Sequence, residues 1–129
     1  MAVLGIDLGE KRVGIAISRS RLLAERYALL EFSKNILKDP AGFEDLVTRL
    51  RAILRREEVD LLVVGLPLLA DGSLSEFAKK IKNLAQKLGF LLGVKVEFEN
   101  EAYSSEPGTS DDEAARLILE QYLNSKRRK

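Results

Sequence analysis

Acidic side chains are the strongest candidates for chemistry in this chain. The segment GIDLGEKRVGIAIS, residues 5–18, places Asp7 between two apolar runs, where an isolated charge is unusual. The 129 residues include no histidine and no cysteine. Histidine bases, thiolate nucleophiles and zinc–thiolate sites are therefore excluded. Catalysis would depend on carboxylates, hydroxyls and lysines, although a buried aspartate that caps a turn is the structural alternative for Asp7.

Two adjacent aspartates begin the last predicted helix. Ser110 followed three residues later by Glu113 is typical of a capping box, which places Asp111 and Asp112 in the first helical turn. The macrodipole favours negative charge there, and this is a sufficient structural role for both. Asp111 nevertheless lies near the centre of the apolar helix face and Asp112 near its edge. That face consists of residues 114, 115, 118, 119, 122 and 123. Because this face packs against the sheet, we predict that Asp111 points toward Asp7 and Glu101, whereas Asp112 can stay in water.

The composition narrows the classes of protein that this chain can represent. Its 21 basic and 20 acidic residues nearly cancel, so any affinity for nucleic acid must come from the placement of charge. Asp7 interrupts the first apolar run, and no run approaches the roughly 18 residues of a membrane span. We expect one domain over residues 1–129, without membrane contact and located in the cytoplasm.

Apolar periodicity predicts an alternation of strands and helices. Strands are expected at residues 2–8, 13–18, about 24–32, 59–67 and 94–99. Helices are expected at residues 42–58, from about 77 to 89, and at 111–123, with 124–129 as a frayed basic tail. This order predicts an α/β fold with a mixed five-stranded sheet, flanked by helices. The first three strands are antiparallel, and βαβ crossovers follow.

The segment GLPLLADGS follows the fourth predicted strand. Gly65 lies at the carboxyl end of that strand, which is the usual ligand side of such sheets. Asp71 and Gly72 predict a tight turn. Ser73 and Glu76 predict a capping box for the next helix.

Three segments resemble the YqgF/RuvX family, whose fold is ribonuclease H-like. DLGEKRVGIAIS resembles the opening motif of these Holliday-junction-resolvase-like proteins. VVGLPLLADGSLSEFAKKIKNLAQKL is similar to the second motif of the family, and DDEAARLILEQYL to its closing helix. The resemblance covers most of the chain in the expected order, and its second motif is the most specific.

The resemblance implies a metal-dependent nuclease that acts on structured nucleic acid in the maturation of the 5′ end of pre-16S rRNA. It implies catalytic and metal-binding roles for Asp7, Glu101 and Asp111, with Mg²⁺ or Mn²⁺ as the ion, because hard cations prefer oxygen ligands. The candidates for contact with nucleic acid are Gly9, Lys11, Arg12 and Gly65. The expected partners are precursor rRNA and ribosomal particles, or branched DNA, and the expected state is a monomer or a weak homodimer.

The chain departs from the family near the second acid. It has Asn100 and Ala102 on either side of Glu101, where family members have aspartate and arginine, and the segment that follows is shorter. Glu101 could then be only a solvated loop acid. These departures favour one alternative function, a catalytically silent module that binds RNA or the ribosome. A Holliday junction resolvase is a second alternative, because it would use the same chemistry on a four-way DNA junction.

Overall fold

The computed structural model describes residues 1–101 and 109–127, and it contains five strands and three helices in the described residues. The elements are β1 (Ala2–Leu8), β2 (Arg12–Ser18), β3 (Glu25–Glu31), α1 (Pro40–Glu57), β4 (Val59–Leu66), α2 (Glu76–Leu92), β5 (Lys95–Asn100) and α3 (Asp111–Arg127). No helix in these ranges is both long and apolar enough to cross a bilayer.

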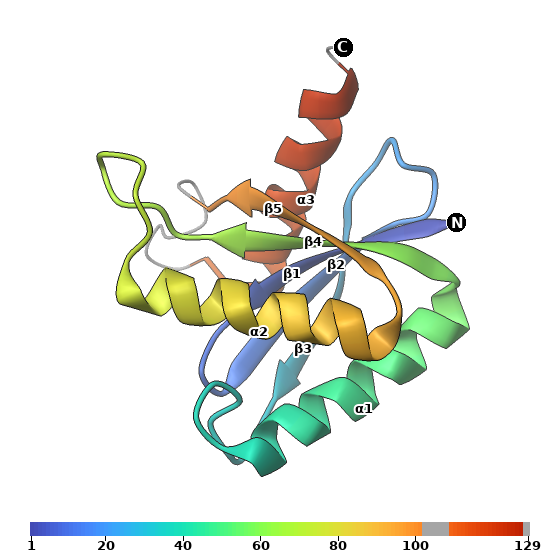
Figure 1. Ribbon diagram of the computed structural model, residues 1–129. Helices are drawn as coiled ribbons and strands as arrows, with labels where there is room; N and C mark the ends of the chain where they lie inside the picture. Colours follow the sequence, from blue (N-terminus) through green and yellow to red (C-terminus); the bar gives the residue numbers. More distant parts are fainter. Residues whose placement is uncertain (102–108, 128–129) are drawn as a thin grey trace.

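The strands form one mixed sheet in the order β3-β2-β1-β4-β5. β2 is antiparallel to β1 and β3, whereas β4 is parallel to β1 and β5. Helices α1 and α2 cover one face of the sheet and α3 covers the other (Figure 1). The predicted sheet is confirmed. Because β1, β3, β4 and β5 all run in one direction, the loops that follow them leave from the same edge of the sheet.

Alternation along the strands divides the apolar core into two layers. Leu4, Ile6 and Ile15 point toward α1 and α2 in the larger layer. Val3, Ala16 and Val63 point the other way and pack against the apolar face of α3. Asp7 shares the parity of Val3, so it faces α3 rather than the larger layer.

Helix α1 begins at Pro40, before the predicted start at residue 42, because the Asp39 side chain accepts a hydrogen bond from the Ala41 amide and caps the helix. Helix α2 is capped by Ser75, not by Ser73 as predicted. Ser73 instead donates to Asp71 in a turn that contains Gly72, which has a φ of 85°. The predicted Asp71–Gly72 turn is therefore confirmed.

Two helices extend beyond their predicted ends. Helix α2 passes Gly89 and ends at Leu92, because Gly89 is an internal residue whose missing side chain leaves room for Val96 of β5. Helix α3 continues to Arg127, so residues 124–127 are helical rather than frayed, and 128–129 lie outside the described residues. Lys126 explains part of this extension, since it pairs with Glu97 and lies over the Tyr122 ring.

Candidate active site

Asp7 is half-buried near the end of β1, the central strand, and faces the first turn of α3. Burial is the main cause that raises the pKa of Asp7, to about 9, from its ordinary 3.8. A hydrogen bond with the Glu101 carboxyl group and the negative charges of Glu101 and Asp111 raise it further. Asp7 therefore lies where three acidic groups approach one another, and turn capping does not explain its position.

Glu101 follows the last residue of β5 and is held beside β4. Its backbone amide donates a 3.0 Å hydrogen bond to the carbonyl oxygen of Leu66. A β-carbon at Gly65 would lie 3.3 Å from the Glu101 carboxyl carbon, so Gly65 leaves room for this side chain. The hydrogen bond with Asp7 shows that Glu101 turns toward the sheet and is not a solvated loop acid.

Asp111 is the first residue of α3, and a close approach of helix and sheet determines its place. A β-carbon at Gly14 would lie 1.9 Å from the Asp111 carbonyl oxygen, so only glycine fits there. Gly14 is paired with Asp7 across β1 and β2. Gly5 provides a second close contact, one turn or more further along, against Ala115 and Leu119. The helix start is thereby brought beside Asp7.

Asp112 has a different environment from Asp111. A hydrogen bond from the Ser110 hydroxyl is the main cause that lowers the pKa of Asp112, and helix amides and the charge of Arg26 lower it further. Glu113 pairs with Arg116, so its carboxylate does not complete the predicted capping box. The Ser110 carbonyl oxygen accepts from the Ala114 amide, as expected of a residue that precedes the helix. Asp112 thus stabilises the start of α3, while Asp111 interacts with Asp7.

Carboxylate oxygens are the ligands that Mg²⁺ and Mn²⁺ prefer. Within residues 1–101 and 109–127, no three acidic side chains lie close enough together to hold a metal ion. Asp7 and Glu101 are instead joined by a hydrogen bond. The donor set nevertheless fits a hard divalent cation. The raised pKa of Asp7 shows that negative charge is disfavoured here, and a bound cation relieves such repulsion.

The four residues predicted to contact nucleic acid have different environments. Lys11 and Arg12 are exposed at the β1–β2 hairpin. Gly9 has a hairpin role, since its amide donates to the Arg12 carbonyl oxygen at 2.8 Å and a β-carbon would collide with that oxygen. Gly65 is buried beneath Ile118 and beside Glu101, so the structure gives it a positioning role. The predicted departure at Ala102 lies outside the described residues.

Sequence reasoning missed the role of Gly14. A glycine inside a strand rich in β-branched residues can indicate close approach of another backbone, and this signal was present at Gly5 and Gly14. Arg26 was also missed, because its proximity to Asp112 arises only when β3 and α3 are assembled.

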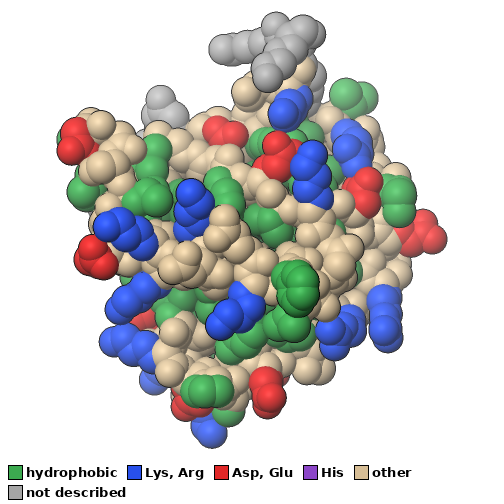
Figure 2. All heavy atoms as spheres, viewed as in Figure 1, with side chains coloured by type: hydrophobic (Ala, Val, Ile, Leu, Met, Phe, Trp, Pro, Cys, Tyr) green, Lys and Arg blue, Asp and Glu red, His purple; other side chains and the backbone are tan. Residues whose placement is uncertain are grey.

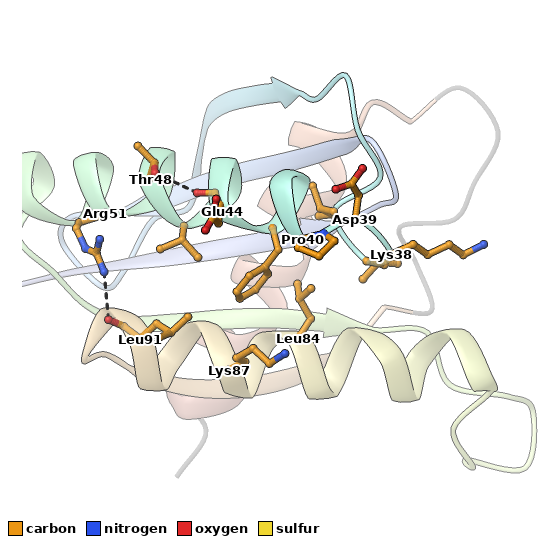
Figure 3. Close-up of a pocket in the computed structure, with 13 residues that line it drawn as sticks. Lys38, Asp39, Pro40, Glu44, Thr48, Arg51, Leu84, Lys87 and Leu91 are labelled. Atoms are coloured by element: carbon orange, nitrogen blue, oxygen red, sulfur yellow. Dashed lines mark hydrogen bonds between the residues drawn. The ribbon is translucent and has the colours of Figure 1, made fainter.

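A groove of about 640 Å³ lies between α1 and α2, on the face opposite α3 (Figure 3). Arg51 of α1 spans it by donating to the Leu91 carbonyl oxygen of α2, and Lys87 lies over the Phe43 ring. Figure 2 shows apolar side chains on this face with lysines and arginines around them. We call Asp7, Glu101 and Asp111 the acidic cluster. None of these three residues lines the groove, so we assign the groove no part in catalysis.

The sheet order and the helices on its two faces define a ribonuclease H-like fold. This fold is shared with RuvC of Thermus thermophilus, seen in complex with a Holliday junction substrate, at a TM-score of 0.64 and 18% identity over 98% of this chain and 96% of RuvC. A second RuvC structure from that organism gives a TM-score of 0.62. The chain belongs to the RuvX family, since the family model described as Holliday junction resolvase matches residues 1–125.

Relatives in several organisms carry the name "Putative pre-16S rRNA nuclease". The relative in Thermosynechococcus vestitus is 32% identical over 143 aligned residues, which cover 98% of this chain and 89% of the relative. The relative in Dictyoglomus thermophilum is 32% identical over 130 residues, which cover 100% and 84% respectively. The predicted family is confirmed. The description of the family and the names of these relatives are those of enzymes that act on nucleic acid.

Proposed function

We propose that this protein is a metal-dependent nuclease that cleaves structured precursor RNA in the maturation of the 5′ end of pre-16S rRNA. The observation that carries the proposal is the Asp7–Glu101 carboxyl pair, with Asp111 as a third negative charge beside it. The names of the relatives support the choice of substrate. Ribosomal precursors are cytoplasmic, and the proposal therefore includes a cytoplasmic location.

Asp7, Glu101 and Asp111 would hold Mg²⁺ or Mn²⁺. When bound, such an ion supplies charge neutralisation at the scissile phosphate and lowers the pKa of water. Asp7 would have to lose its proton before such an ion binds, because its pKa is raised. Asp7 and Glu101 would then offer oxygens from the ends of β1 and β5, which lie on either side of β4. Asp111 approaches from the helix across the sheet face. The protein would thus supply oxygen donors from three separate elements. Because these elements are rigid, they would hold the donors in one arrangement around the ion.

A second substrate is favoured by a separate observation. The family model carries the description Holliday junction resolvase, and the RuvC fold is seen with a four-way DNA junction. The same acids would serve for either phosphodiester. A dimer would present two sites to such a junction, whereas a monomer suits an RNA end.

The deciding experiment incubates purified protein with labelled precursor rRNA and with a four-way DNA junction, each in Mg²⁺, Mn²⁺ and EDTA. We expect the protein to cleave RNA in Mg²⁺ or Mn²⁺ but not in EDTA. We expect no cleavage by Asp7→Asn protein under any of these conditions. Cleavage of only the junction would assign the second substrate. Binding of RNA without product in any metal would show that the protein is a silent RNA-binding module. Sedimentation of the same sample decides between monomer and homodimer.

A further inference from the structure

A basic pocket of about 610 Å³ lies between the β1–β2 hairpin and the loop that joins β3 to α1. Lys11 from the hairpin and Lys34 and Lys38 from the loop line it together with Ser33. The pocket is lined by three cations from two segments that are distant in sequence. We call it the lysine pocket.

Hydrogen bonds hold the two segments against each other. The amides of Phe32 and Ile36 donate to the carbonyl oxygens of Lys11 and Glu10, both at 2.8 Å. The Asn35 side-chain amide donates to the Glu10 carboxylate at 3.0 Å. The backbone positions that carry the lysines are therefore fixed relative to each other, and only the side chains remain free to adapt.

The charges of the lysine pocket are left available for a ligand. Lys11, Lys34 and Lys38 are exposed, and none forms an ion pair with any residue in the described ranges 1–101 and 109–127. Asp39, the acid in the pocket lining, accepts from the Ala41 amide as the cap of α1. Figure 3 shows the Lys38 side chain extending away from the neighbouring α1–α2 groove.

The position of the lysine pocket relates it to the acidic cluster. The hairpin follows β1 and the Lys34 loop follows β3, and both strands end at the sheet edge where β5 delivers Glu101. Asp7 is four residues before Lys11. A polyanion bound at the acidic cluster could therefore continue around this edge to the lysines.

We propose that the lysine pocket binds the phosphodiester backbone of a nucleic acid. The phosphates bound there belong to a different part of the same strand than the phosphate at the acidic cluster. The inference rests on the proposed function for its substrate class. Ammonium groups act as point charges toward phosphate without reading base sequence, so the pocket contributes affinity and not sequence preference.

The test measures binding alone, in EDTA, by fluorescence anisotropy of a labelled RNA hairpin at several KCl concentrations. The variant is Lys11→Ala/Lys34→Ala/Lys38→Ala. The matched control is Lys79→Ala/Lys80→Ala/Lys82→Ala, which removes the same charge from α2. We expect the pocket variant to bind about tenfold more weakly, with the slope of log affinity against log salt smaller by about 2 to 3, because each phosphate contact contributes about 0.7 to 0.9. The control should retain the wild-type slope.

Equal slopes for the pocket variant and the control would overturn the proposal, as would failure of the wild-type protein to bind the RNA. A second arm titrates inorganic phosphate by NMR. Phosphate-induced shifts at the three lysines, with unchanged RNA affinity in the pocket variant, would identify a small-anion site and also overturn the proposal. Weakened RNA binding by the pocket variant, together with no cleavage in the metal assay, would retain the pocket and reject the nuclease function.

Discussion

Gly14 of β2 lies against the carbonyl oxygen of Asp111, and a β-carbon at position 14 would come within 1.9 Å of that oxygen. Real β-carbons essentially never approach other heavy atoms closer than 3.0 Å. Any larger residue at position 14 must therefore push the start of α3 away from the sheet by about 1 Å. The distance between Asp111 and Asp7 depends on this contact.

Gly14→Ala should weaken Mn²⁺ binding and reduce any nuclease activity by about 100-fold, which is the scale expected for a 1 Å misplacement in an active site. Calorimetry measures the metal affinity. Gly5→Ala is the matched control, since its β-carbon also collides with α3, at Leu119 and Ala115, but away from Asp111. If the two folded variants lose metal affinity equally, the contact at Gly14 has no special role in positioning.

Asp7→Asn should abolish activity yet stabilise the fold. Because the pKa of folded Asp7 is raised to about 9, the folded chain holds a proton that the unfolded chain releases above about pH 4. The contribution of this proton on Asp7 to the free energy of unfolding is complete below about pH 4 and is lost as the pH rises toward 9. Asparagine mimics the protonated acid, so the variant should exceed the wild type by a few kcal/mol, as an order-of-magnitude estimate, at pH 8 and match it near pH 3. Urea unfolding at both pH values checks this.

Asp111→Asn and Asp112→Asn should separate the roles of two neighbours. Asp111→Asn should remove metal binding and activity, because Asp111 is the acid that interacts with Asp7. Asp112→Asn should leave both nearly unchanged and cost less than about 1 kcal/mol, since Asp112 is only half-buried and solvent screens its contacts. The lowered pKa of Asp112 means that this contribution is present at neutral pH and is lost in acid. Metal affinity of both variants decides the matter, and a damaging Asp112→Asn with a silent Asp111→Asn would contradict the assignment.

Ser18→Ala should be neutral or should stabilise the protein by about 1 kcal/mol. Ser18 is fully buried on the α3 side of β2, and its hydroxyl has no hydrogen-bond partner in the part of the chain that the structure describes. Alanine removes a desolvated polar group and leaves only a small void. Thermal unfolding measures the effect. A loss of more than about 1 kcal/mol would show that the hydroxyl has a partner in solution.

The sequence was sufficient to predict the sheet because its strands have strong and distinct patterns. Continuous apolar residues at 61–66 indicated a central parallel strand, and the family motifs indicated the acids. Helix ends were less predictable. The capping-box pattern with Glu76 favours Ser73, but the Asp71 turn binds Ser73 and leaves Ser75 to cap the helix. The raised pKa of Asp7 could not be predicted from local sequence patterns. It arises from burial and from contact with Glu101, which is 94 positions further along the chain.

The closing of the acidic cluster by α3 has a consequence for the order of folding. Asp7 and Asp111 are separated by 104 positions, from 7 to 111, so their approach completes a long chain loop. Contacts of this kind form late, after local hairpins and crossover helices. A chain in which α3 has not docked carries only two of the three acids, Asp7 and Glu101, near one another. Assembly of the complete cluster is therefore a signature of completed folding, and metal affinity can be followed as a late kinetic probe of the native state.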